Sequence, residues 1–383
     1  MRIGIDARGI YRELDGIGRF GVNILKELAH IDNSNEYIIY KNTQMRHLIV
    51  NKPNFIEKVI DVPRFTIREQ IVLPRMLKKD KLDVLYCLHN VLPIFYNGKS
   101  IVTIHDIMAI AFPWFYSAFP FVKRYIGLYY FKLFVKLSVK KANKVIVTSK
   151  HTRKEVMQYL NLSEDKVKIC PEAADVIFRP IKDDNLLNNV LEKYKIHKPF
   201  ILYAGNFKPY KNLRNLIRAY NLLNVARGFI PRKGLPELVM AGGDKKYGPL
   251  LKEFTQKKGL EEKINFIGYV NQDDLPVLMN GALLFVFPSI YEGFGLPPLE
   301  AMACGTPVIT SNISSLPEVV DDSAVLVDPY DTKEIANAIE RVLVDKELRE
   351  KLISKGLERV KLFSWEKCAR ETLKVYEEVY NEK

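Results

Sequence analysis

The sequence predicts an α/β protein built on parallel β-sheets. Short apolar runs recur along the 383-residue chain and alternate with stretches of helical periodicity, a pattern typical of repeated strand–helix–strand units. Several of these runs end in a loop that contains glycine and leads directly into a helix. The chain is long enough for two or three domains, so we expect more than one such sheet.

The composition is that of an ordinary globular protein, with 48% hydrophobic and 27% charged residues. The chain has no C-x-x-C pair, so neither a zinc site nor a disulfide framework is predicted. Its four cysteines are far apart: Cys87, Cys170, Cys304 and Cys368. We expect reduced thiols in a cytoplasmic protein. Charges close to the first residue predict no signal peptide, and no apolar run is long enough to cross a bilayer.

In the first half of the chain, the apolar runs predict strands over 2–7, 37–40, 83–87, 100–104, 145–149 and 167–170. Helical patterns lie between them, and one begins near Arg19. Gly16 and Gly18 open that helix after the first strand. A glycine turn between a strand and a helix lets an anion approach the backbone closely. The alternative is a simple turn that binds nothing.

A polar stretch with prolines follows Phe178, and we place a domain boundary there, between domains 1–178 and 179–363. In the second half, strands are predicted over 199–204, 238–241, 264–267, 282–287 and 307–310, with a short strand that ends at Asp328. Helices are predicted over 186–195, 332–344, 347–362 and 365–381.

The most informative segment is the loop that follows the apolar run 282–287. Glycines are followed by Pro297 and Pro298 and then by helix formers, which indicates a strand, a glycine loop and a helix N-terminus. Unpaired N–H groups and the helix dipole make such a terminus a phosphate site. Glu292 and Glu300 bracket the loop. Hydrogen bonds to charged groups contribute about 1.5–3 kcal/mol, so both carboxylates suit sugar hydroxyls. The alternative is a glycine turn with two solvated glutamates.

Two further side chains follow strand ends, where ligands of open α/β sheets bind. His105 and Asp106 come directly after the strand 100–104, and the alternative is a structural histidine held by a carboxylate. Lys211 lies between the strand 199–204 and a helix, a position suited to phosphate. The alternative for Lys211 is an ordinary solvated lysine.

The net charge of +13 is unevenly distributed, and no acidic residue lies between Asp106 and Glu155. Within 119–144 the chain is basic and aromatic, with Lys132, Lys136, Lys140 and Lys144 at four-residue intervals. A basic amphipathic helix favours peripheral contact with an anionic membrane. A core helix with one solvated lysine face is the alternative. Nucleic acid is not expected as a partner, because no recognised binding motif accompanies the charge.

Several segments in one order extend along nearly the whole chain: IGIDARG at 3–9, DGIGRF at 15–20, TIHD at 103–106, GNFKPYKN at 205–212, FIGYV at 266–270, EGFGLPPLEAMACGTPVI at 292–309 and LPEVVDDSAVLVDP at 316–329. Together they resemble the retaining glycosyltransferases of family 4, in their mannosyltransferase-like branch. The resemblance implies a GT-B fold of two Rossmann-like domains facing a cleft. It also implies that the C-terminal helix, 364–383, crosses back onto the first domain.

The resemblance implies a nucleotide-sugar donor, with no metal and no further cofactor. On the phosphate side it assigns Lys211, with Asn206 at the position of the family's usual arginine and Lys208 as a compensating cation. Gly16 and Gly18 are expected beside the donor diphosphate or beside the acceptor that enters the cleft.

On the sugar side, the resemblance assigns Glu292 to the donor hydroxyls, Glu300 to the ribose and His105 to the neighbourhood of the donor sugar. The main chain at Val270 is expected to meet the nucleobase. The amides of the glycine loop are expected to bind phosphate, at Gly293, Phe294, Gly295 and Leu296.

The implied function is retaining transfer of a hexose, with mannose from GDP-mannose favoured, to a sugar or a lipid-linked glycan in cell-envelope polysaccharide biosynthesis. The expected location is cytoplasmic, with peripheral attachment at the inner face of the membrane. One alternative is a sugar-nucleotide epimerase or phosphorylase of the same fold. Another is a non-catalytic nucleotide-binding module at the membrane.

Overall fold

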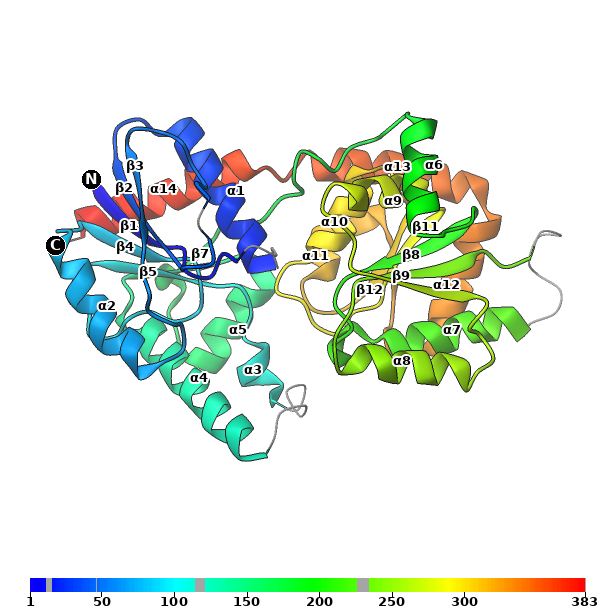
Figure 1. Ribbon diagram of the computed structural model, residues 1–383, viewed down its shortest axis with the longest axis horizontal. Coiled ribbons are helices and arrows are strands. Elements are labelled where there is room, and N and C mark those ends of the chain that lie inside the picture. Colours follow the sequence, from blue (N-terminus) through cyan, green and yellow to red (C-terminus); the bar gives the residue numbers. More distant parts are fainter. Residues whose placement is uncertain (12–15, 46, 114–120, 226–233, 383) are drawn as a thin grey trace. The chain divides into compact units, whose positions relative to one another are not determined.

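The computed structural model describes residues 1–383 except 12–15, 46, 114–120, 226–233 and 383. The chain forms two compact units, each with its own sheet (Figure 1). Unit 1 contains Met1–Glu172 and Ser364–Lys383, and unit 2 contains Ala173–Phe363.

Unit 1 is built on a seven-stranded sheet in the order β3-β2-β1-β4-β5-β6-β7, and every pairing in it is parallel. Its strands are β1 (Arg2–Asp6), β2 (Glu36–Lys41), β3 (Phe55–Val59), β4 (Val84–Cys87), β5 (Ser100–Ile104), β6 (Lys144–Val147) and β7 (Val167–Ile169). Its helices are α1 (Gly16–Ile31), α2 (Ile67–Lys79), α3 (Met108–Ala111), α4 (Phe121–Lys141), α5 (Lys150–Leu160) and α14 (Trp365–Asn381).

Unit 2 is built on a six-stranded parallel sheet in the order β10-β9-β8-β11-β12-β13. Its strands are β8 (Phe200–Ala204), β9 (Glu237–Ala241), β10 (Ile264–Gly268), β11 (Leu284–Phe287), β12 (Val308–Ser311) and β13 (Val325–Val327). Its helices are α6 (Asp184–Lys193), α7 (Leu213–Val225), α8 (Tyr247–Gln256), α9 (Asp274–Gly281), α10 (Leu296–Ala303), α11 (Leu316–Val320), α12 (Thr332–Val344) and α13 (Lys346–Val360).

The two sheets share one topology. In each, the first three strands run outward in one direction, and the fourth strand returns to pair with the other side of the first. The strand order therefore reverses between β1 and β4 in unit 1 and between β8 and β11 in unit 2. Ligands of such sheets bind outside the carboxyl ends of the strands at this reversal. The predicted parallel α/β architecture with Rossmann-like domains is confirmed.

The central strands are buried along their whole length because helices cover both faces of the sheet. All residues of β4, β5, β8 and β11 are buried, as expected for a doubly covered parallel sheet. The sequence analysis missed β3, because two charged residues interrupt the apolar residues of its sequence FIEKV and only Phe55 is buried at this edge of the sheet.

The C-terminal helix α14 belongs to unit 1 and packs against α1. The Ser364 side chain caps it by accepting a hydrogen bond from the backbone N–H of Lys367. Trp365, at its first position, meets Phe20 of α1 edge-on at a centroid distance of 5.9 Å. The buried apolar face of α14 packs against α1, so the last helix of the chain is part of the same unit as the first.

The basic segment 119–144 differs from its predicted form at both ends. Residues 119 and 120 lie outside the described residues, and α4 ends at Lys141. Lys144 lies in β6, so the prediction of a helical lysine stripe that includes Lys144 is wrong. A regular four-residue spacing of lysines does not show where a helix ends, because the spacing can continue by chance into the next element. No helix within the described ranges is both long and apolar enough to span a bilayer.

Candidate functional site

The glycine loop after β11 has the predicted form. Gly295 precedes α10 with φ of +121°, and a Cβ there would meet Leu316 Cδ2 at 2.9 Å. Only glycine fits this position without strain. Pro297 and Pro298 hold the first turn of α10 but carry no N–H group, so Leu296 and Leu299 supply the backbone donors of that turn.

Lys211 and Glu292 form an ion pair that joins the loop after β8 to the loop after β11. Lys211 Nζ lies 2.5 Å from Glu292 Oε1, and the two side chains are 8% and 13% exposed. The same ammonium group lies 5.1 Å from the ring centroid of Tyr210 and 4.8 Å from that of Phe287. Aromatic faces attract cations at this range, so the charge is held at the reversal of the second sheet.

Backbone hydrogen bonds fix these two loops to each other. The N–H of Ile290 donates to the carbonyl of Tyr210 at 2.7 Å, and Ser289 Oγ donates to the same carbonyl at 3.2 Å. The separation of Lys211 and Glu292 is therefore set by main-chain geometry as well as by their own attraction.

Two serines that the sequence analysis missed hold the glycine loop from the other side. The N–H of Glu292 donates to Ser314 Oγ at 3.0 Å, and Ser314 Oγ donates to the carbonyl of Glu292 at 2.7 Å. Ser315 Oγ donates to the carbonyl of Phe294 at 2.6 Å. These serines follow β12, and their separation from the loop in sequence left no local signal. The amide of Glu292 is thus committed to a serine.

Glu300 lies on α10 and is only 2% exposed. Burial, together with the nearby Glu300 carboxylate, raises the pKa of the Cys304 thiol to about 12. Cys304 is therefore a protonated, structural thiol. All four cysteines are free and buried, in agreement with the prediction of no disulfide.

Asn206, at the position of the family's usual arginine, shapes its own loop. Its Oδ1 accepts from the N–H of Lys208 at 3.2 Å, and its Nδ2 donates to the Tyr210 hydroxyl at 3.3 Å. Lys208 is exposed and, with Arg214 and Arg218, lines a cavity of about 450 Å³ between α7 and α8. Lys211 is the buried cation of this loop.

The backbone segments at the ends of β8, β9 and β10 lie very close to one another, and each contains a glycine at the point of contact. A Cβ on Gly242, whose φ is +115°, would lie 1.9 Å from the carbonyl oxygen of Gly205. The N–H of Gly242 also donates to the carbonyl of Gly268 at 2.6 Å. Val270 follows at this edge and is half-buried. The need for glycine at 242 arises from backbone contact between neighbouring loops, which the sequence analysis did not foresee.

In unit 1, His105 follows β5 as predicted and is almost fully buried. Its Nε2 lies 2.9 Å from the carbonyl oxygen of Leu88, and its Nδ1 lies 3.4 Å from Glu172 Oε1. Burial alone would lower the pKa of His105, but the hydrogen bond and charge of Glu172 outweigh it and raise the pKa above its usual value. Glu172 was not predicted, because it lies far from His105 in sequence.

The two glycines of the first loop differ in their surroundings. Gly16 begins α1 and is exposed, with open space where a Cβ would stand. Gly18 is buried in the first turn of α1. Their proximity to a donor diphosphate stays a prediction.

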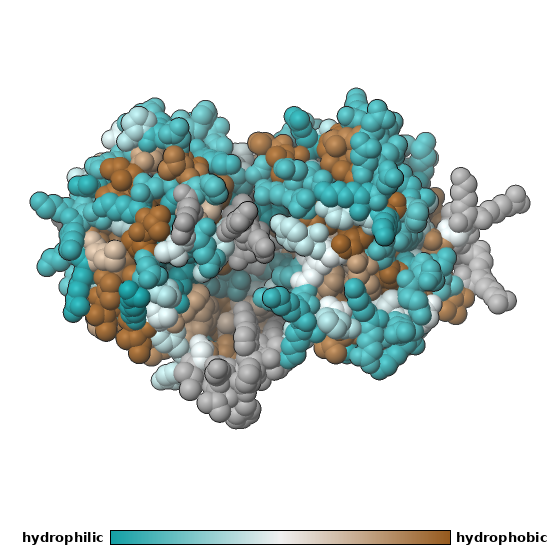
Figure 2. Space-filling view, in the orientation of Figure 1, coloured by the Kyte–Doolittle hydropathy of each residue, from teal (hydrophilic) through white to brown (hydrophobic). Residues whose placement is uncertain are grey.

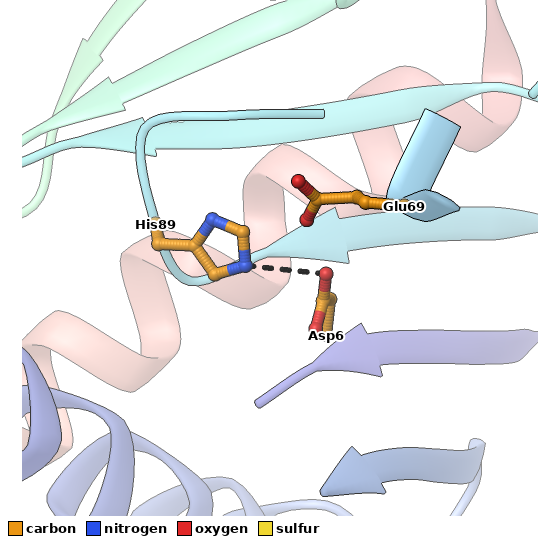
Figure 3. Close-up of side chains that lie close together, drawn as sticks. All are labelled: Asp6, Glu69 and His89. Carbon is orange, nitrogen blue, oxygen red and sulfur yellow. Dashed lines mark ion pairs between the residues drawn. The ribbon is translucent and has the colours of Figure 1, made fainter. Parts of the chain in front are cut away.

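A buried charged cluster lies at the reversal of the first sheet (Figure 3). Asp6 ends β1, His89 follows β4, and Glu69 comes from α2. His89 Nε2 lies 3.2 Å from Asp6 Oδ2. Arg8 donates from Nη2 to Asp6 Oδ2 and to Glu69 Oε1, both at 2.6 Å. All four side chains are at most 1% exposed.

This cluster is the one group of three potential metal ligands among the residues that the structure describes. The guanidinium of Arg8 already bonds both carboxylates, so the cluster carries its own cation. Burial opposes the charge of Asp6, but Arg8 and His89 outweigh it and hold the pKa of Asp6 well below its usual value. Burial and the charge of Arg64 lower the pKa of His89 to about 4. The cluster is therefore a closed ion-pair network with a neutral histidine.

Comparison with known proteins gives the class of the chain. The family model described as "Glycosyltransferase Family 4" matches residues 22–177, and that described as "Glycosyl transferases group 1" matches residues 189–359. Sucrose-phosphate synthase from Thermosynechococcus elongatus is similar in structure, with a TM-score of 0.76 and 21% identity over 99% of each chain. The fold and these matches define a glycosyltransferase of GT-B fold.

Named relatives narrow the class. The O-antigen chain mannosyltransferase B of Escherichia coli is 29% identical, and the match covers 98% of this chain and 99% of that protein. The serotype-specific mannosyltransferase WbdA of Escherichia coli is 30% identical over 75% of this chain, and the match spans 36% of its length. The chain belongs to glycosyltransferase family 4, in its mannosyltransferase-like branch.

Proposed function

We propose that the protein transfers a mannosyl residue from GDP-mannose to a glycan acceptor, with retention at the anomeric carbon, in the synthesis of a cell-envelope polysaccharide. The observation that carries this proposal is the Lys211–Glu292 pair, which joins the two loops at the reversal of the second sheet. The mannosyltransferase relatives support the choice of sugar.

The pair suggests how the donor is received. A diphosphate that enters between the loops offers Lys211 a stronger anionic partner than one carboxylate. Glu292 is then released toward the hydroxyls of the donor sugar. As the sugar–phosphate bond breaks, charge develops on the diphosphate, and a preorganised cation aimed at that charge accelerates departure. Removal of one such donor typically costs about 10²–10³ in kcat.

The remaining contacts follow from position. Glu300, on α10, is proposed to accept hydrogen bonds from the ribose. The backbone donors of Leu296 and Leu299 face the phosphates, and the main chain at Val270 meets the base. The proposal includes no metal and no further cofactor, since Lys211 supplies the positive charge.

A thermal-shift panel of GDP, UDP and ADP, each with its sugar conjugates, tests the donor. We expect the largest stabilisation by GDP and GDP-mannose, because binding to the folded state raises its stability by mass action. A larger shift with a uridine nucleotide would overturn the choice of GDP. An NMR assay of the anomeric configuration of the product then tests retention. Donor turnover without an acceptor would indicate an epimerase, and turnover that requires inorganic phosphate a phosphorylase.

We further propose that the acceptor is lipid-linked and that unit 1 docks on the inner face of an anionic membrane. The docking face combines α4 with α2, which lie side by side: the Tyr130 hydroxyl donates to the carbonyl of Thr66 at 3.1 Å, and the rings of Phe65 and Phe131 lie 5.9 Å apart. Figure 2 shows hydrophobic residues gathered among hydrophilic ones over α2.

The docking face is both apolar and basic. Ile67 and Tyr129 are each 71% exposed. Its further exposed apolar side chains are Ile71 and Leu133, and its exposed cations include Arg68, Arg75, Lys136 and Lys140. Apolar area and attraction to anionic lipid together determine binding of this kind.

Co-sedimentation with vesicles of phosphatidylglycerol and phosphatidylcholine tests the docking face. We expect the wild type to bind and a double variant, Ile67→Asp with Ile71→Asp, to remain in solution. The matched control is Leu48→Asp, because Leu48 is also exposed in unit 1 but lies outside α2 and α4. If the wild-type protein does not co-sediment with anionic vesicles, membrane docking is refuted, whereas the transferase proposal is unaffected.

A further inference from the structure

We propose that the cavity between α7 and α8 binds a small phosphorylated molecule, at a site separate from the one that Lys211 and Glu292 form. The two helices lie side by side in unit 2 (Figure 1). Neither Lys211 nor any residue of the glycine loop 292–295 lines the cavity. The second site therefore lies within one unit, and it goes beyond the proposed function because it does not depend on the identity of the donor.

The size of the cavity suits one small molecule. Its volume is about 450 Å³, and ligand cavities in proteins commonly measure about 300–1,000 Å³. Part of the lining is apolar: Leu213 and Leu251 are buried, Tyr247 is half-buried and Leu250 is 41% exposed. This apolar wall suits the organic part of a ligand, such as a sugar ring.

Another part of the lining is cationic. Lys208 comes from the loop after β8, and Arg214 and Arg218 come from one face of α7. All three side chains are exposed to solvent. The residues that line the cavity all belong to the described part of unit 2, and none of them is an aspartate or a glutamate. A cavity with this charge attracts an anion.

The two arginines are held in place by groups that leave their charge unpaired. Cζ of Arg214 lies 5.4 Å, and Cζ of Arg218 5.7 Å, from the ring centroid of Phe254 on α8. Arg218 Nη1 also donates to Asn215 Oδ1 at 3.0 Å. Across the residues that the structure describes, neither guanidinium forms an ion pair. Both groups are therefore oriented before a ligand arrives.

The acidic side chains near the cavity are already engaged. Glu253 of α8, whose charge acts on Arg214, pairs with Lys257 Nζ at 2.5 Å. Asp244 Oδ1 accepts hydrogen bonds from two backbone N–H groups at the start of α8, both at 2.9 Å. The positive charge that faces the cavity is thus left for a ligand to neutralise.

The ligand that fits these groups is a phosphate monoester. Like charges four residues apart destabilise a helix, so an anion bound between Arg214 and Arg218 relieves their repulsion. A phosphate monoester carries about −1.5 to −2 charges at pH 7, and guanidinium groups bind its oxygens in pairs. The organic part of the ligand then lies against Tyr247 and Leu250.

Isothermal titration calorimetry with glucose 6-phosphate and with inorganic phosphate tests the site. We expect the wild type to bind glucose 6-phosphate about tenfold more tightly than inorganic phosphate, because only the ester contacts the apolar wall. The double variant Arg214→Gln with Arg218→Gln should lose about 100-fold in affinity for the ester, because two charged hydrogen-bond donors are removed. The matched control, Lys346→Gln with Lys351→Gln, removes the same charge from the exposed surface of α13 and should bind as the wild type does.

A second variant guards against a folding defect in the first. Leu250→Glu places a carboxylate on the wall of the cavity and should also abolish binding, since it repels the phosphate. Denaturation curves that match the wild type show that lost binding is not lost structure. A wild type that does not bind glucose 6-phosphate, or variants that bind it as tightly as the wild type, would overturn the proposal. Equal affinity for the ester and for inorganic phosphate would overturn the assignment of an organic ligand.

A further titration separates this site from the donor site. Lys211→Met should bind glucose 6-phosphate as the wild type does, and the double arginine variant should keep its affinity for the free nucleotide. Loss of glucose 6-phosphate binding in Lys211→Met would place the ester in the donor loops and overturn a separate site. Failure of this proposal and failure of the transferase proposal are therefore distinguishable, because each is measured with its own ligand.

Discussion

The two sheets reverse their strand order in the same way, yet the side chains at the two reversals differ in kind. Between β1 and β4, Asp6, Arg8, Glu69 and His89 form a network whose members are at most 1% exposed. Between β8 and β11, Lys211 and Glu292 form a pair whose side chains are 8% and 13% exposed. The first arrangement is closed to solvent, and the second is partly open.

This difference shows that a shared topology does not determine a shared use. In unit 1, Arg8 bonds both carboxylates and the carbonyl of Val62, so the two carboxylates at the reversal are paired within the protein. In unit 2, one lysine and one glutamate pair across two loops that the backbone already holds together. Under the proposed function a ligand replaces the pair of unit 2, whereas the network of unit 1 cannot be opened without exposing buried charges.

The largest expected effect is the loss of Arg8. Arg8→Met leaves Asp6 and Glu69 buried without their cation, so we expect the free energy of unfolding to fall by about 3–5 kcal/mol. Chemical denaturation monitored by circular dichroism measures this. The control, Arg370→Met, removes a surface arginine of α14 that pairs with Glu366. Equal stability of Arg8→Met and the wild type would show that the network is not structural.

Loss of Lys211 should affect turnover instead of folding. We expect Lys211→Met to reduce kcat about 10²–10³-fold, or about 3–4 kcal/mol of transition-state stabilisation, because the departing diphosphate loses its cation. Steady-state kinetics and a denaturation curve measure the two quantities side by side. Lys346→Met, on the exposed surface of α13, is the control. A fully active Lys211→Met protein would remove the functional distinction between the two reversals.

The network should also give unit 1 a dependence on pH. His89 has a pKa of about 4 in the folded state, and an unfolded histidine titrates near 6.5. Between these values only the unfolded state binds the proton, so stability is lost as pH falls from about 6.5 to 4. The shift corresponds to about 3 kcal/mol. The free energy of unfolding, measured by chemical denaturation at several pH values in this range, should change less with pH for His89→Gln than for the wild type. The same pH dependence in both proteins would contradict a neutral His89.

The smallest expected effect concerns Glu300. If it accepts hydrogen bonds from the ribose, Glu300→Ala should weaken binding of the free nucleotide by about 1.5–3 kcal/mol. Isothermal titration calorimetry measures the affinity, and the 2′-deoxynucleotide serves as the matched ligand. We expect the wild type, but not the variant, to discriminate against that ligand. Unchanged affinity of the variant would show that Glu300 is a structural residue of α10.

The sequence by itself determined the parallel architecture and the candidate residues Lys211, Glu292 and Glu300. Local information was sufficient for the strands and for the helix start, because short apolar runs bounded by turn residues favour buried strands and proline suits the first turn of a helix. The edge strand β3 was missed because two charged residues interrupt its apolar residues and leave no such run. The extent of the lysine stripe was wrong because spacing alone cannot locate a helix end.

Only the tertiary structure decided which side chains meet across long distances in sequence. Glu172 faces His105, Ser314 and Ser315 hold the glycine loop, and Arg8 joins β1 to Glu69 of α2. It also decided that Gly242 has no room for a side chain, because the carbonyl of Gly205 occupies that space. Contacts of this kind depend on the register and twist of the strands that carry them. The sequence encodes such contacts only through the whole fold.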